Sequence, residues 1–192
     1  MKIFSSLQLC TALAAAVCVA WPAFAHHVVP VSPFDRIELE GGGHVMVKRG
    51  DLQQVRLMEG SLAFTRLSVD DSRKLRIESC RQECPHHYDL EIEITTPHID
   101  ALAVSGGGVI ESEGSFSPPH DLALAIEGGG KIDARTVSAE KVTAAVNGGG
   151  LIKLRAKGKL TAAVDGGGEI RYWGNPRVTQ AIDGGGEVQR GD

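Results

Sequence analysis

Six Gly-Gly-Gly triplets restrict the fold of this chain more than any other feature of its sequence. They occupy residues 41–43, 106–108, 128–130, 148–150, 166–168 and 184–186. The first glycines of the last five triplets lie 22, 20, 18 and 18 residues apart, a period typical of repeat proteins. Glycine is a poor helix former and reaches positive φ without steric cost. Each triplet therefore predicts a corner of the chain and argues against a helix.

The residues that flank the triplets form two aliphatic columns. Two residues before each triplet stand Leu39, Val104, Ile126, Val146, Val164 and Ile182, and two residues after it stand Val45, Ile110, Ile132, Ile152, Ile170 and Val188. Upstream, apolar side chains continue at every second position, as at Leu122 and Leu124, which is the period of a β-strand. We predict an all-β fold, a parallel β-helix or β-solenoid in which strand, glycine corner and strand form one rung.

The first half of the chain is less regular. Gly41 and Gly106 are 65 residues apart, and the interval holds four further strand candidates, at 55–58, 62–69, 74–79 and 88–95. We expect residues 26–100 to form an irregular, partly antiparallel capping half and residues 101–192 to form the regular rungs. A solenoid needs a cap because a terminal rung otherwise exposes its apolar layer. No comparable cap follows the last triplet, so the uncapped C-terminal end is a candidate surface for a homo-oligomer.

Residues 1–25 have the features of a secretory signal peptide. Lys2 precedes an apolar stretch, and Ala23-Phe24-Ala25 is a typical cleavage site. Its removal leaves a single domain, residues 26–192, which we expect to be soluble and exported to the periplasm, with secretion or display at the cell surface as the alternative. Without Lys2, 19 basic and 24 acidic side chains remain. This balance argues against a nucleic-acid partner, because phosphates require clustered lysine and arginine.

Three motifs, together with the signal peptide and the glycine corners, resemble the GIN domain family. They are Phe34-Asp35-Arg36-Ile37, Ile92-Glu93-Ile94-Thr95-Thr96-Pro97 and Leu102-Ala103-Val104-Ser105-Gly106. The resemblance covers residues 34–190 and implies the head domain of an auto-transporter adhesin. It assigns no catalytic residue to this chain. The family more often has Gly-Ser-Gly where this chain has Gly-Gly-Gly, a change that leaves the corner intact.

A polar column directly before the triplets is the first candidate ligand site. It includes Glu127, Asn147, Asp165 and Asp183. Their oxygens are expected to accept hydrogen bonds from the glycine N–H groups of their own corners, as in Asx turns. The alternative is that carboxylates stacked on successive rungs share a Ca²⁺ ion.

Threonines four residues earlier are expected on the same outward face as this polar column. They are Thr143, Thr161 and Thr179. On the outward side of each strand, one alanine lies between the threonine and the polar residue. The result is a flat strip of threonine, alanine and acid. Such a strip predicts a surface that lies against a glycan or a protein partner.

Cys80, Cys84, His86 and His87 form the densest cluster of reactive side chains. In an exported protein, a disulfide between the two cysteines is the favoured interpretation. A Zn²⁺ site is the alternative, although the ligand spacing of a zinc finger is missing. Apart from these calcium and zinc alternatives, we expect no cofactor.

These features favour an exported, non-catalytic binding or adhesion module of the cell envelope. One competing hypothesis is a polysaccharide-active enzyme, a glycan lyase or hydrolase, with Asp165, Asp183 and Arg171 as its candidate catalytic groups. Another is an envelope assembly or stress factor that acts through a protein partner. A groove lined by all three side chains would favour the enzyme, whereas a flat strip favours binding.

Overall fold

The computed structural model describes residues 27–80, 83–116 and 121–192, and the predicted signal peptide lies outside them. Every regular element in the described residues is a β-strand, which confirms the all-β prediction, and no helix there could cross a membrane. The strands are β1 (His27–Val29), β2 (Arg36–Gly41), β3 (His44–Arg49), β4 (Gln54–Glu59), β5 (Arg66–Val69), β6 (Lys74–Glu78), β7 (Glu91–Thr96), β8 (Ala101–Gly106), β9 (Val109–Glu113), β10 (Asp121–Gly128), β11 (Lys131–Gly148), β12 (Leu151–Gly166), β13 (Glu169–Trp173), β14 (Arg177–Asp183) and β15 (Glu187–Arg190).

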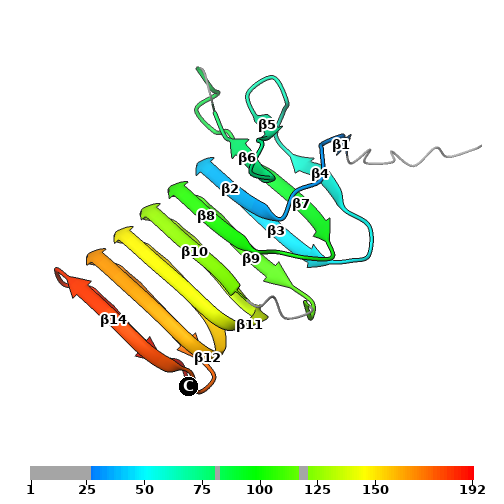
Figure 1. The fold of residues 1–192 in the computed structure, drawn as a ribbon. Coiled ribbons are helices and arrows are strands. Elements are labelled where there is room, and N and C mark those ends of the chain that lie inside the picture. Colours follow the sequence, from blue (N-terminus) through cyan, green and yellow to red (C-terminus); the bar gives the residue numbers. More distant parts are fainter. Residues whose placement is uncertain (1–26, 81–82, 117–120) are drawn as a thin grey trace, which may run out of the picture.

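The strands are hydrogen-bonded into one strongly curled, mixed sheet (Figure 1). One run of parallel neighbours, which we call the first row, is β6-β2-β8-β10-β11-β12-β14. A second row of parallel neighbours is β7-β3-β9-β11-β12-β13-β15. The long strands β11 and β12 belong to both rows, because each continues from one row around the bend into the other. The curl therefore follows from the continuity of these two strands.

The predicted aliphatic columns are confirmed as columns of register partners. The column from Leu39 to Ile182 runs across the first row, and the column from Val45 to Val188 runs across the second row. All members except Ile182 and Val188, which lie on the last strands, are buried. They belong to a single hydrophobic core. Because apolar burial contributes roughly 25 cal/mol per Å², these columns hold the two rows together.

The glycine triplets form the corners between the rows, and their three positions differ. The first glycine has positive φ, +118° at Gly148, and its carbonyl accepts a hydrogen bond of 3.0 Å from the Gly167 N–H of the next corner. The third is packed tightly: a Cβ on Gly150 would lie 2.5 Å from Ile126 Cγ2, whereas one on Gly149 would meet no atom within 4 Å. Only the first and third positions therefore require glycine.

Parallel pairing extends into the first half of the chain. β2 and β3 flank the first triplet and pair with β8 and β9, and β6 and β7 add one strand to each row. The antiparallel pairs β1-β4, β4-β7 and β5-β6 lie at the N-terminal end. The strand predicted at 62–69 begins only at Arg66, because the N–H groups of Phe64 and Thr65 turn back to the Ser61 carbonyl. The narrower prediction of a parallel β-solenoid stays a prediction.

Candidate functional site

The outward side of the first row from β8 to β14 carries three parallel columns of side chains, and we call this surface the flat face. The acidic column contains Ser105, Glu127, Asn147, Asp165 and Asp183; the alanine column contains Ala103, Ala125, Ala145, Ala163 and Ala181; the threonine column ends in Thr143, Thr161 and Thr179. Neighbouring members of a column are register partners, so successive side chains repeat at about 4.8 Å. The structure thus places all seven predicted ligand-binding residues on one surface.

The flat face is open and shallow because its centre is built from alanine. Ala125, Ala145, Ala163 and Ala181 are all exposed. Together with Glu127, Asn147, Asp165 and Asp183 they line an open depression of about 400 Å³. Small side chains in a column leave no ridge, so an extended molecule can lie across several strands.

The acidic column and the three threonines of the flat face have no side-chain partners within the described part of the chain. None of the acidic-column side chains, nor those of Thr143, Thr161 and Thr179, makes a hydrogen bond or ion pair there. The expectation that they accept bonds from the glycine N–H groups of their own corners is wrong. Those N–H groups donate instead to the preceding corner, as Gly149 N–H does to the Gly128 carbonyl at 3.0 Å. In-register stacking supplies a backbone acceptor, which leaves the side-chain oxygens free.

A basic column at the opposite edge of the flat face was missed by the sequence reasoning. Lys141, Lys159 and Arg177 are register partners. Lys141 and Lys159 line an open hollow of about 750 Å³ together with Thr143 and Thr161. The signal was present in the sequence, because each cation stands six residues before a member of the acidic column. The flat face is therefore basic along one edge and acidic along the other.

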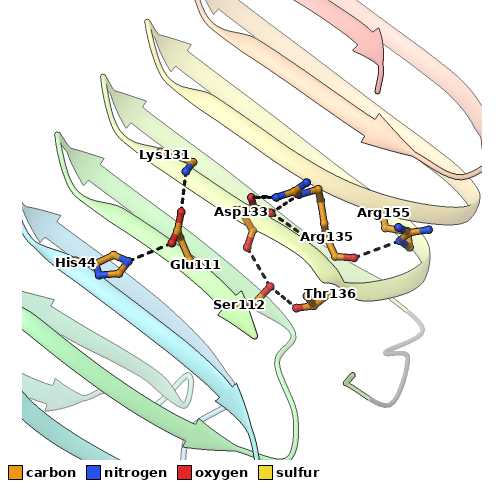
Figure 2. Close-up of polar contacts among 8 residues, drawn as sticks. All are labelled: His44, Glu111, Ser112, Lys131, Asp133, Arg135, Thr136 and Arg155. Carbon is orange, nitrogen blue, oxygen red and sulfur yellow. Dashed lines mark hydrogen bonds and ion pairs between the residues drawn. The ribbon is translucent and has the colours of Figure 1, made fainter. Parts of the chain in front are cut away.

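The outward side of the second row has a different character, because Glu111, Asp133 and Glu169 are each paired with a cation of the same chain; Figure 2 shows the first two pairs. Glu111 on β9 lies 2.7 Å from the Lys131 ammonium on β11 and 3.4 Å from His44 Nε2 on β3. The hydrogen bond from Lys131 lowers the pKa of Glu111, with His44 contributing in the same direction. Glu111 is therefore held ionised between two donors.

The same pairing continues around Asp133, where Figure 2 shows the side chains in contact. Arg135 donates to both carboxylate oxygens of Asp133, at 2.8 and 2.7 Å, and its guanidinium lies 5.2 Å from the Trp173 ring centre. Partial burial acts to raise the pKa of Asp133, but the hydrogen bonds from Arg135 outweigh it and the net shift is downward. Arg155 and Ser112 complete the cluster by donating to the backbone carbonyls of Arg135 and Asp133. The polar groups of this cluster are therefore bonded within the chain.

The comparisons with known proteins agree with the sequence motifs. A family model described as "Putative auto-transporter adhesin, head GIN domain" matches residues 33–120 and 119–176. The chain belongs to the GIN domain family. No curated protein matches it.

Solved structures resemble this GIN domain at low sequence identity. A "putative adhesin" from Bacteroides fragilis is 17% identical over 86% of this chain and 95% of that chain, with a TM-score of 0.57. A "putative cell adhesion protein" from Clostridium sporogenes is 11% identical over 86% and 97% of the two chains, with a TM-score of 0.40. At 17% identity the likeness to the Bacteroides fragilis protein is one of fold. The family description suggests an adhesion-like module rather than an enzyme, and it implies an exported, envelope-associated protein.

The candidate catalytic groups of the enzyme hypothesis lie on opposite sides of a corner of the GIN domain. Asp165 and Asp183 are register partners on the flat face and line its depression. Arg171 follows the corner on β13, in the second row, where it forms an ion pair with Glu169. The hydrogen bond between them raises the pKa of Arg171 and lowers that of Glu169. Arg171 is thus engaged away from the two aspartates.

The cysteine and histidine cluster lies before β7, away from the flat face. Cys80 and Cys84 are joined by a disulfide, with their Cα atoms 5.8 Å apart. Their sulfurs are therefore not thiolate ligands, and His86 and His87 are exposed. Within residues 27–80, 83–116 and 121–192, no three His, Cys, Asp or Glu side chains gather as a metal-binding group.

Proposed function

We propose that this GIN domain is an exported, non-catalytic binding module of the cell envelope, with the flat face as its binding surface. The proposal includes a coiled, solenoid-like arrangement of its repeats, which keeps the outward columns rigid. Its partner is an extended glycan or a protein surface that lies across several strands. We place it in the periplasm, with the cell surface as the alternative.

The contrast between the two outward surfaces carries this proposal. On the second row, Glu111, Asp133 and Glu169 are each bonded to a cation of the same chain. On the flat face, Asp165 and Asp183 have no such partner within the described residues. Hydrogen bonds and ion pairs already made within the chain must be broken before those groups can bind a ligand, whereas free groups only exchange water. The flat face is therefore the surface prepared for an external partner.

The repeat geometry fits a polymeric partner. Chemically equivalent side chains recur at about 4.8 Å across the strands, so a chain that crosses β10 to β14 meets the same contact several times. Each contact is weak, but several contacts made by one molecule act together. Only the first contact carries the full entropy cost of lost translational freedom. Exposed hydroxyls beside carboxylates are suited to sugar hydroxyl groups, which both donate and accept hydrogen bonds.

A glycan array probed with the chain lacking residues 1–25 tests this proposal, in parallel with pull-down of purified envelope polysaccharides. The test variant is Ala163→Arg, which raises a long side chain in the middle of the flat face. The matched control is Ala63→Arg, the same change at an exposed site before β5. We expect Ala163→Arg to weaken binding at least tenfold and Ala63→Arg to leave it unchanged.

Two outcomes would contradict the proposal. Equal binding by both arginine variants would remove the flat face from the interaction, and release of shortened glycan products would contradict the non-catalytic assignment. A folded protein that binds no glycan on the array would redirect the search to protein partners, with the same two variants as the test of the face.

A further inference from the structure

The last strands of the sheet, β14 and β15, have a hydrogen-bonded neighbour on one side only. Within the described residues, β14 pairs with β12 and β15 pairs with β13. Figure 1 shows β14 as the outermost strand of the row, at the end opposite to the antiparallel strands. A strand in this position presents unpaired backbone N–H and C=O groups that can template a further strand.

The inward side chains of β14 lack the cover that their equivalents have. Ile182 is 42% exposed, although its register partner Val164 is 2% exposed. Val178, the partner of buried Leu160, is also partly exposed. Gln180 stands at the inward position that Ala162 occupies one strand earlier. A further strand beyond β14 would bury this apolar layer, and that strand must offer a partner to the Gln180 amide.

The sequence of β14, Arg-Val-Thr-Gln-Ala-Ile-Asp, is complementary to itself when read in the opposite direction. In an antiparallel pair of two β14 strands centred on Gln180, Arg177 stands opposite Asp183, Val178 opposite Ile182, and Thr179 opposite Ala181. Directly opposed residues point to the same side of a sheet, so charges meet on the flat face and aliphatic side chains meet inside. The two Gln180 amides face each other, and each can donate to and accept from the other.

Other arrangements lose this match. A slip of one residue places inward side chains opposite outward ones, and a slip of two places Arg177 opposite Ala181 and leaves the charges without partners. Arg177 and Asp183 make no ion pair with the described residues of their own chain.

At the N-terminal end, the edge strands β1 and β5 have only three and four residues, against seven in β14. A head-to-tail stack would therefore pair strands of unequal length.

We propose that two copies of this GIN domain associate tail to tail through antiparallel pairing of their β14 strands, with Gln180 on the two-fold axis. The interface is isologous, so it closes on itself and stops at a dimer. The axis is perpendicular to the first row, and the flat faces of both copies therefore lie on the same side. The acidic column of each copy continues into the basic column of the other, which doubles the length of the binding surface. This association does not depend on the proposed function of that surface.

Sedimentation velocity on the chain lacking residues 1–25, over a range of concentrations, tests the association. We expect the wild-type mass to rise from one chain to two and to go no higher. Gln180→Lys brings two like charges together on the axis and should shift the dissociation constant upward at least tenfold. Thr179→Lys is the matched control. It adds the same charge one residue away, but the side chain points outward and lies opposite Ala181 of the second copy. This variant should retain the dimer.

Charge exchange tests the same register in a way that tolerates a small effect on folding. Arg177→Asp should weaken the dimer, and addition of Asp183→Arg to the same chain should restore it, because the two residues face each other only across the axis. A wild-type protein that stays monomeric into the millimolar range would overturn the proposal, and so would failure of the double variant to recover while circular dichroism shows both variants folded.

Cysteine cross-linking reads the register directly. Gln180→Cys should form a disulfide-linked dimer under mild oxidation, because opposed Cα atoms in an antiparallel pair lie about 4.5–5.5 Å apart, within the span of a disulfide. Thr179→Cys alone should stay unlinked, whereas a mixture of Thr179→Cys and Ala181→Cys chains should cross-link. Linking of Thr179→Cys with itself, in place of Gln180→Cys, would refute this pairing.

Discussion

Replacing the three glycines of one corner by alanine, one at a time, tests how the repeats stack. The corner at Gly148, Gly149 and Gly150 is suited to this because repeats lie on both sides of it. The structure predicts three different costs for the same chemical change, which a uniform preference for glycine in corners would not.

The expected costs follow from the surroundings of each Cβ. At Gly148 a side chain meets a φ of +118° and the Gly128 carbonyl oxygen at 2.6 Å. The backbone strain costs about 1–3 kcal/mol and the overpacking about 1–3 kcal/mol, so the sum is about 2–6 kcal/mol. At Gly150 only overpacking applies, against Ile126 Cγ2 at 2.5 Å, at about 1–3 kcal/mol. Gly149 has open space, and alanine there should stabilise by about 0.4–1 kcal/mol by restricting the unfolded chain.

Equilibrium unfolding in urea measures these differences. Trp173 is the only tryptophan left once residues 1–25 are removed, so its fluorescence reports on the C-terminal repeats, and circular dichroism reports on the whole sheet. The free energy of unfolding should fall in the order Gly149→Ala, Gly150→Ala, Gly148→Ala. A loss of more than about 1 kcal/mol for Gly149→Ala, or a Gly148→Ala protein as stable as wild type, would refute the reasoning, since both fall outside the ranges given by strain and packing.

Three further predictions concern stability. The hydrogen bond from Lys48 lowers the pKa of Glu93 below 4.5, so its stabilisation is present above that pH and is lost as the pH falls through the lowered value. Glu93→Gln should therefore cost about 1–2 kcal/mol at neutral pH and little in acid, as urea titrations at several pH values will show. Ile152→Ala in the core should cost about 2–5 kcal/mol, and Val188→Ala on the last strand should cost less than half of that because Val188 is only partly buried, a difference readable in the urea midpoints. Tyr88→Phe removes the hydroxyl that bonds Ser61 and Thr65, and thermal unfolding should register a loss of about 1–2 kcal/mol.

The alternation of side chains was readable from the sequence because it depends only on local geometry. A strand turns successive side chains to opposite faces, so the aliphatic columns had to face one way and the threonines and acids the other. The glycine period then set which residues became register partners. Both inferences hold in the structure, as the alignment of Val146 with Val164 and of Asn147 with Asp165 shows.

The pairing of charges could not be read from the same pattern. Glu111 and Asp165 look alike in sequence, each an acid at an outward position of a strand. The difference arises because Lys131, two residues before the register partner of Glu111 on β11, reaches the Glu111 carboxylate diagonally. No cation among the described residues reaches Asp165 in this way, and its neighbours across the strands are Asn147 and Asp183. The bonding of the glycine N–H groups was misjudged for a related reason, since their acceptors belong to the preceding corner and not to their own.

The sequence by itself determined that the chain forms short strands joined at glycine corners, which side of each strand is buried, and which residues stack. These properties follow from the preference of glycine for positive φ and from the two-residue period of a strand. Only the tertiary structure decided that β2 and β3 join the regular rows, that Glu111, Asp133 and Glu169 on the second row are bonded to cations of the same chain, and that the acidic column of the flat face has no partner among the described residues. The physical reason is that hydrogen bonds and ion pairs depend on which side chains lie side by side across strands, and that distance is fixed only when the sheet curls and its register is set.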